Sequence, residues 1–149
     1  MDTYAPCLDY MRSYTGKHVI VTGASGAVGY QIVESLIKVG AKSLLLIANN
    51  HMEDLEVKVQ RLRLQTANTV SKVNFLQVDF NDPRTIADLV LESFKSKLDA
   101  RVDALFCCHG VLPEVNCENA SMPEVDKTLK INVRSVLHIV SLIFPFMKE

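Results

Sequence analysis

One glycine-rich segment of this chain has the residue types that a phosphate-binding turn requires. It runs from Thr22 to Gly29 and follows the apolar run 18–21 directly. Glycine lets the backbone turn tightly and approach a pyrophosphate, and the N–H groups at the start of a following helix favour negative charge. A tight turn without a ligand is the alternative, but a place between a strand and a helix favours phosphate binding. The candidate cofactor-binding residues of this segment are Gly23, Ser25, Gly26, Val28 and Gly29.

The elements that must position this segment alternate along the chain. Short β-rich runs predict strands over 18–21, 44–48, 73–78 and 102–108. Longer stretches at helical spacing separate them, which is typical of an α/β domain with a parallel sheet. Residues 1–16 show no clean periodicity and are interpreted as a surface arm, so the domain itself is expected to occupy residues 17–149.

Apolar spacing also predicts the helices. The first helix should bury one face, formed by Val28, Ile32, Val33, Leu36 and Ile37, and end at Gly40. An amphipathic helix is expected from Met52 to Gln65. Another begins at Asp82-Pro83, with Asp82 as its N-cap and Ile86, Leu89, Val90 and Phe94 turned inward. The last runs from about Pro123 to Met147 and is apolar on nearly every side beyond Asn132, so it should be buried in this chain or against a partner.

Taken in order, these motifs resemble the short-chain dehydrogenase/reductase family from Lys17 to the end. The family's phosphate loop reads Thr-Gly-x-x-x-Gly-x-Gly, and Thr22, Gly23 and Gly29 match it. Ala27 replaces the middle glycine, with Gly26 one place earlier. The resemblance implies a doubly wound Rossmann fold with strand order 3-2-1-4, incomplete at its end, that binds NAD(P) at the carboxyl ends of the strands.

The resemblance assigns roles to the ends of the third and fourth predicted strands. Asp79 stands where the family's Asp contacts adenine, and Phe80 would line that pocket; a strand-end Asp that caps a turn is the alternative. Where the family has Asn-Asn-Ala-Gly this chain has Cys-Cys-His-Gly, so only Gly110 matches. Gly110 and Cys108 are the candidate cofactor contacts of this segment. The alternative there is that Cys107 and Cys108 are small buried residues and His109 is a loop histidine with satisfied hydrogen bonds.

Asn132 is the catalytic residue that the resemblance implies. In the family this Asn interrupts a helix and holds a water of the proton relay, which requires an amide that donates and accepts. A solvent-facing Asn on a helix is the alternative. The family's catalytic Ser and Tyr-x-x-x-Lys pair would lie beyond this segment, since Tyr14 is followed four places later by His18 and Tyr30 by Glu34. The chain alone should therefore be inactive.

The end of the second predicted strand indicates which dinucleotide is preferred. An acidic residue there would take the ribose hydroxyls of NAD, and a basic one the 2′-phosphate of NADP. Ala48 occupies that place and Asn49, which follows, can donate hydrogen bonds. The missing carboxylate removes a repulsion against phosphate, so NADP is favoured over NAD.

Composition excludes several other functions. With 149 residues the chain suits one domain, and its net charge of −1 gives no basic surface for nucleic acid or anionic membrane. The start lacks a secretory signal, and no apolar stretch reaches the ~20 residues of a membrane span, so a cytoplasmic protein is expected. The four cysteines form no Cys-x-x-Cys pair, which predicts free thiols and no metal site.

Two other functions stay open beside a hydride-transferring oxidoreductase that acts on an alcohol or carbonyl. One is a dinucleotide-binding or interaction module that has lost the chemistry, and the other is an inactive fragment. In the family the helix after Asn132 contributes to a dimer contact, so self-association through this helix is also expected.

Overall fold

The computed structural model describes residues 10–66, 70, 72–87, 90–91, 101–113 and 117–147. A parallel sheet lies at its centre with strand order β3-β2-β1-β4, which confirms the predicted order. The strands are β1 (His18–Thr22), β2 (Ser43–Ala48), β3 (Lys72–Gln77) and β4 (Ala104–Cys107). Each lies within one or two residues of its predicted bounds.

The central strands β1 and β2 are buried along their whole length. Parallel strands covered on both faces read as continuous apolar runs, and Val19-Ile20-Val21 and Leu44-Leu45-Leu46-Ile47 are such runs. Side chains that alternate along them feed two separate cores. Val19 and Leu44 belong to one, and Ile20 and Leu45 to the other.

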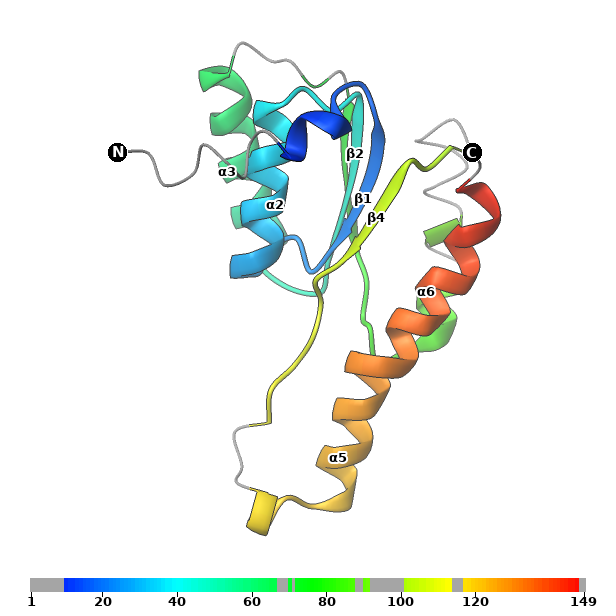
Figure 1. Ribbon diagram of the computed structural model, residues 1–149. Helices are drawn as coiled ribbons and strands as arrows, with labels where there is room; N and C mark the ends of the chain where they lie inside the picture. The colour runs from blue at the N-terminus through cyan, green and yellow to red at the C-terminus, as the bar shows by residue number, and fades with distance from the viewer. Residues whose placement is uncertain are drawn as a thin grey trace.

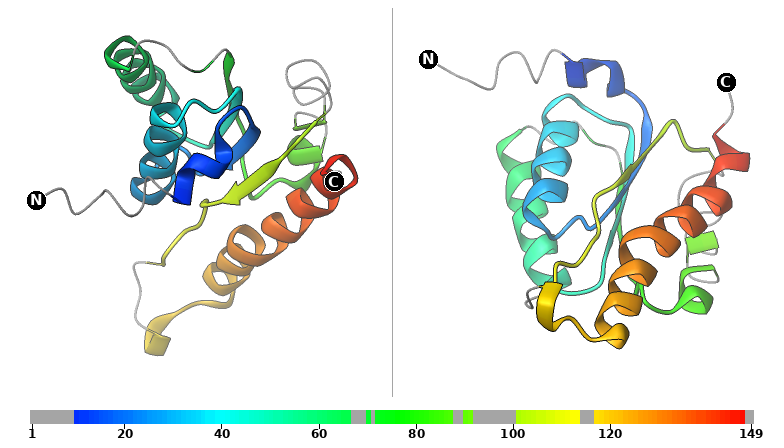
Figure 2. Two further views of the ribbon diagram at one scale, coloured as in Figure 1. Left: turned by 45° about the horizontal axis from the view of Figure 1, so that its top comes forward. Right: turned by 60° about the horizontal axis from the view of Figure 1, so that its bottom comes forward.

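The two cores lie on opposite faces of the sheet. The helices α2 (Ala27–Lys38) and α3 (Met52–Gln65) pack on one face, and α6 (Ser135–Ile143) lies across the other (Figures 1 and 2). This is the doubly wound arrangement that the sequence predicts. It leaves the carboxyl ends of the strands open between the two helical layers.

The helix α2 buries Gly29, Val33, Leu36 and Ile37, and Gly40 follows it with φ +76°. Val28, predicted on the inner face, is instead 67% exposed. The reason is that Gly29, the next residue of the first helical turn, is the one that packs against the glycine-rich loop at Gly23. The amphipathic helix α3 has the bounds that its apolar spacing predicts.

Asp82 caps the helix that follows β3, as predicted. Its Oδ1 accepts a hydrogen bond from the Arg84 backbone N–H at 2.9 Å, and residues 83–87 are helical. Ile86 and Val90 are buried in the second core. Leu89 and Phe94, also predicted to point inward, lie outside the described residues.

The last helical region is divided. It consists of α5 (Met122–Leu129), the π-helical turn η3 (Lys130–Arg134), α6 and the 3-10 turn η4 (Phe144–Phe146). This region is buried in the chain on one face only: Ile139 and Ile143 are buried, whereas Leu137 and Phe144 are 65% and 68% exposed. Burial of the other face against a partner stays a prediction. Among the described residues, this region alone is long and apolar enough to cross a membrane by length and composition, a test that a core helix of a soluble protein also passes. The expectation that no such stretch exists is corrected accordingly.

The part of the expected arm that the structure describes packs onto the domain. The 3-10 turn η1 (Arg12–Tyr14) is followed by Gly16, whose N–H donates to the Gly40 carbonyl at 2.9 Å. The Tyr14 ring meets Phe106 of β4 edge to face, with 5.4 Å between centroids.

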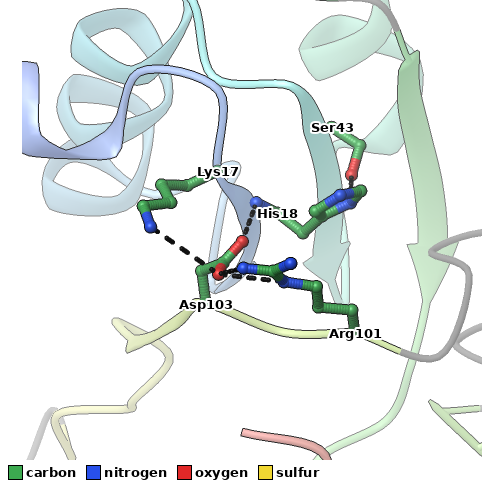
Figure 3. A network of polar contacts seen from close by, with 5 residues as sticks. All are labelled: Lys17, His18, Ser43, Arg101 and Asp103. Carbon is green, nitrogen blue, oxygen red and sulfur yellow. Dashed lines mark hydrogen bonds and ion pairs between the residues drawn. The ribbon is translucent and has the colours of Figure 1, made fainter. Parts of the chain in front are cut away.

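A polar network fastens the amino ends of the strands (Figure 3). Asp103 accepts hydrogen bonds from the His18 backbone N–H at 2.8 Å and from Arg101, and Lys17 lies 4.0 Å from its carboxylate. The His18 ring forms a hydrogen bond with Ser43 at 2.7 Å. These contacts tie β1 to both of its neighbours at the end of the sheet opposite the glycine-rich loop.

Candidate functional site

A cleft opens at the carboxyl ends of β1, β2 and β4. Its walls come from the glycine-rich loop, the ends of these strands and the turn η3. The lining residues are Gly23, Ser25, Gly26, Asn49, Asn50, Phe80, Cys108, His109, Gly110, Val111 and Ile131. Among the residues that the structure describes, no Asp, Glu, Lys or Arg lines this cleft, so no fixed charge repels an anionic ligand.

The glycine loop is packed so tightly that two of its glycines have no room for a side chain. Gly23 has φ +65°, and a Cβ there would lie 2.5 Å from the His109 backbone nitrogen. A Cβ on Gly29 would overlap the Gly23 carbonyl oxygen. Gly26 is less constrained, since its Cβ would lie 3.3 Å from that oxygen, and its N–H donates to the same oxygen at 3.0 Å.

The amino end of α2 is open to an anion. Its N-cap residue is Gly26, no side chain caps it, and no acidic residue occupies its first turn. In contrast, α5 begins with Ser121 and Glu124 as a capping box, in which Glu124 Oε2 accepts the Ser121 backbone N–H at 2.9 Å and the Ser121 hydroxyl at 2.6 Å. Uncapped N–H groups and the helix dipole favour a phosphate at α2. Ser25 and Gly26 line the cleft at this point, whereas Val28 and Gly29 do not.

At the end of β2 the two predicted cofactor-binding residues, Ala48 and Asn49, lie in different environments. Ala48 is fully buried within the sheet and does not line the cleft. Asn49 and Asn50 line it instead, and both are exposed. Gln77 Nε2 donates to the Asn49 carbonyl at 2.9 Å, which holds this turn against β3. Asn50 is a cleft residue that no sequence pattern indicated, because a residue beyond the strand end shows no periodicity.

The structure separates the two candidates that follow β3. Phe80 is buried and lines the cleft. Asp79 is exposed and outside the lining set, and its Oδ1 accepts the Asn81 N–H at 2.9 Å. This is the turn-capping contact that was the alternative for Asp79, and it leaves the second carboxylate oxygen available.

His109 is buried and makes polar contacts on both sides of its ring. Nδ1 lies 2.6 Å from Thr22 Oγ1, and Nε2 lies 2.6 Å from Ser135 Oγ. The ring stacks on Phe80, with 3.9 Å between centroids and 7° between planes. Burial lowers the pKa of His109 to about 4, so the ring is neutral at physiological pH.

The two thiols beside His109 differ in environment. Cys107 is exposed, which makes the interpretation of both thiols as buried wrong for this residue; it ends β4, the strand at the edge of the described sheet. Cys108 is half-buried and lines the cleft, and burial raises the pKa of its thiol. Both are free, and the described part of the chain contains no cluster of metal-ligating side chains.

Asn132 lies in the π-helical turn and faces the loop after β4. Its Nδ2 donates to the Val111 carbonyl and its Oδ1 accepts the Val111 N–H, each at 2.8 Å. A Cβ on Gly110 would lie 3.3 Å from that Oδ1, so glycine lets the loop approach the amide closely. Single π-helical turns often mark functional sites. Asn132 itself does not line the cleft, but its neighbour Ile131 and its partner Val111 do.

The family model described as short chain dehydrogenase matches residues 17–149. Among curated proteins, the chain is 29% identical over 143 residues to L-rhamnose 1-dehydrogenase (NADP(+)) of Thermoplasma acidophilum, which covers 93% of this chain and 52% of that protein. The chain spans about half the length of the first curated relatives it matches.

Solved structures show the same fold. L-Sorbose reductase of Gluconobacter frateurii, complexed with NADPH and L-sorbose, superposes with a TM-score of 0.75 at 24% identity, over 89% of this chain and 48% of that one. An NADH-dependent reductase complexed with NAD gives a TM-score of 0.75 at 23% identity, over 91% and 54%.

Proposed function

Since the chain belongs to the short-chain dehydrogenase family, we propose that it is the cofactor-binding half of an NAD(P)-dependent oxidoreductase. The complete protein would transfer hydride between a nicotinamide and an alcohol or carbonyl. One observation carries the proposal. The cleft at the carboxyl ends of the strands contains the uncapped start of α2, and its lining residues carry no fixed charge. The same end of such sheets binds ligands in other α/β proteins.

The residues of the cleft suit the parts of a dinucleotide. Gly23, Ser25 and Gly26 would hold the pyrophosphate with backbone N–H groups at the start of α2. Phe80 would supply an apolar wall for the adenine. Asp79, the exposed residue before it, would contact the adenine from outside the lining of the cleft. When bound, the nicotinamide supplies the hydride chemistry.

The remaining candidates would lie on the nicotinamide side. The backbone at Cys108 and Gly110 would pass close to the nicotinamide ribose, because both residues line the cleft after β4. Asn132 would keep the loop that carries Val111 in place and would form part of the proton path.

We assign NADP as the preferred cofactor. Asn49 and Asn50 present amides where a carboxylate would repel a 2′-phosphate. A second hollow shares Ser25 with the main cleft and is lined by His51 and Lys58, and the Lys58 ammonium lies 5.5 Å from the Tyr30 ring centroid. The Lys58 ammonium would attract a 2′-phosphate. The Asp54 carboxylate, which also lines this hollow, would repel it, so we expect a preference for NADP and not an absolute selection.

Calorimetric titration of the chain with NADPH and NADH tests both parts of this proposal. The wild-type chain should bind NADPH more tightly. Asn49→Asp should weaken NADPH at least tenfold relative to NADH, since like charges brought together cost several kcal/mol and about 1.4 kcal/mol is tenfold. Asn119→Asp makes the same chemical change at an exposed residue outside the cleft and should leave the ratio unchanged.

The outcomes separate the possible functions. Binding of neither nucleotide would refute the cofactor site. Tight binding by a complete protein that turns over no carbonyl would favour the binding module, which the replacement of two family asparagines by Cys107 and Cys108 supports. Equal loss of NADPH affinity in the Asn49 and Asn119 variants would contradict the assignment to Asn49. A cytoplasmic location and self-association through α6 complete the proposal.

A further inference from the structure

His109 joins three segments that are far apart in the sequence. Its ring contacts Thr22, the last residue of β1, and Ser135, the first residue of α6. These partners lie 87 and 26 residues away along the chain. All three side chains are buried, with exposures of 8%, 0% and 3%, so water cannot readily take over a broken contact.

The hydrogen bonds around the ring run in one direction. Ser135 Oγ donates its proton to the Ile131 carbonyl at 2.5 Å, so toward His109 it can only accept. Nε2 of His109 therefore carries the proton, and because the ring is neutral, Nδ1 accepts from Thr22 Oγ1 at 2.6 Å. The Thr22 hydroxyl also lies 3.4 Å from the Phe106 carbonyl, a longer contact than the one to Nδ1. Thr22 Oγ1 in turn accepts the Cys108 N–H at 3.3 Å. A neutral imidazole protonated on Nε2 satisfies every group in this chain of bonds.

Both ends of this chain of bonds reach the proposed cofactor site. Thr22 immediately precedes Gly23, the tightly packed residue of the glycine loop. Ser135 holds the carbonyl of Ile131, next to Asn132 in the π-helical turn. The turn is tied back to the loop after β4 because Asn132 bonds Val111 on both sides. A shift of the imidazole would therefore disturb the glycine loop and the Asn132 turn together.

We infer that His109 is a positioning residue that holds the glycine loop and the Asn132 turn in one arrangement through its bonds to Thr22 and Ser135. This inference rests on the proposed function for the meaning of the site. The hydrogen-bonding role itself can be measured without a nucleotide.

Two substitutions separate hydrogen bonding from packing. His109→Phe keeps a ring against Phe80 and removes both bonds, whereas His109→Gln supplies an acceptor and a donor at a similar separation. The readout is hydrogen exchange of the Val111 N–H, which reports whether Asn132 still bonds this loop. Exchange should speed up at least tenfold in His109→Phe, which loses two bonds each worth up to about a factor of ten, and should return toward the wild-type rate in His109→Gln.

Ser135→Ala gives the same test from the far side of the ring and decides the matter if a His109 variant does not fold. It should also speed exchange at Val111. Ser141→Ala is its control, because Ser141 is an exposed residue of the same helix that bonds only the His138 carbonyl in this structure. Nitrogen-15 spectra of the wild-type ring should show Nε2 protonated and Nδ1 unprotonated near neutral pH.

Wild-type exchange rates in His109→Phe or Ser135→Ala would overturn the inference, as would equally fast exchange in His109→Phe and His109→Gln. A protonated Nδ1 at neutral pH would overturn it too. NADPH should bind about tenfold more weakly to His109→Phe than to His109→Gln, again by the value of a bond. If the wild-type chain binds no nucleotide, the proposed function fails, and the exchange rates alone decide the role of His109.

Discussion

The side-chain amide of Asn132 and the backbone of Val111 form a reciprocal pair, in which each donates one hydrogen bond to the other at 2.8 Å. The pair fixes the π-helical turn to the loop after β4 and uses one donor and one acceptor of the amide. The remaining amide hydrogen and oxygen lone pair stay available for a water.

Asn132→Ala should lower the free energy of unfolding by about 1–2 kcal/mol, because two hydrogen bonds are lost at an exposed position where water can partly replace them. Urea denaturation measures this difference. Asn119→Ala, at an exposed residue that lies outside the cleft, is the control. No difference between the two variants would show that the pair contributes nothing to stability.

Gly23→Ala should destabilise the chain far more than Gly16→Ala. Both glycines have positive φ, which costs an alanine about 1–2 kcal/mol. Only at Gly23 would the new Cβ also meet the backbone, 2.5 Å from the His109 nitrogen, whereas nothing lies within 4 Å at Gly16. Urea denaturation of both variants checks this, and calorimetry should show weakened NADPH binding in Gly23→Ala alone. Equal losses would mean that the loop can relax around a side chain.

Asp103→Asn should reveal a pH-dependent stabilisation at the amino end of the sheet. Burial alone would raise the pKa of Asp103, but hydrogen bonds from the His18 N–H and from Arg101 lower it overall. A carboxylate with a lowered pKa stabilises the fold above its unfolded pKa of about 3.9 and loses this effect as pH falls through the folded value.

The Asp103→Asn variant should therefore be about 1–2 kcal/mol less stable than wild type near pH 7, as expected for a hydrogen bond to a charged group, and the two should converge as the pH falls through the lowered folded pKa of Asp103. Chemical denaturation at a series of pH values gives the curve. Asp126→Asn changes an exposed residue of α5 and should run parallel to wild type. A constant difference at every pH would contradict the ionic contribution of Asp103.

The 149-residue chain by itself should not turn over NADPH or NADH with a panel of carbonyl compounds. None of its four tyrosines is followed four residues later by a lysine, so the family's acid and base are not supplied by this chain. Turnover that survives repurification and disappears on Asn132→Ala would show that the chain carries its own chemistry.

The isolated chain should associate through the exposed face of α6. Leu137 on this helix and Phe144, the first residue of η4, leave apolar surface open, and such patches drive association. Light scattering should show the average mass rising with concentration. Leu137→Glu together with Phe144→Glu should reduce the rise, and Gln31→Glu on α2, across the sheet, should not. A monodisperse monomer at high concentration would rule this surface out.

Much of the fold could be predicted because it depends on local patterns. The bounds of α3 follow from apolar residues at helical spacing, and Asp82 was identifiable as an N-cap because capping joins neighbours in the chain. The alternation of strands and helices indicated a parallel sheet, and the resemblance to the short-chain dehydrogenase/reductase family implied the order of its strands.

The side on which individual side chains lie could not be predicted from local patterns. Val28 has the spacing of a buried residue, yet Gly29 takes the contact with the loop, and Ala48 turns into the sheet while Asn49 and Asn50 face the cleft. In each case a shift of one residue changes the face on which a side chain lies. Such shifts depend on how neighbouring elements pack and leave no periodic signal.

The bridging role of His109 depends still more on the folded chain. Its sequence neighbours indicated a loop histidine with satisfied hydrogen bonds, and this much is correct. They could not indicate Thr22 and Ser135 as its partners, because a hydrogen bond requires donor and acceptor within about 3 Å and in line. Only the packing of β1, β4 and α6 around one point brings these three side chains to that distance, so the residue types alone could not reveal the contact.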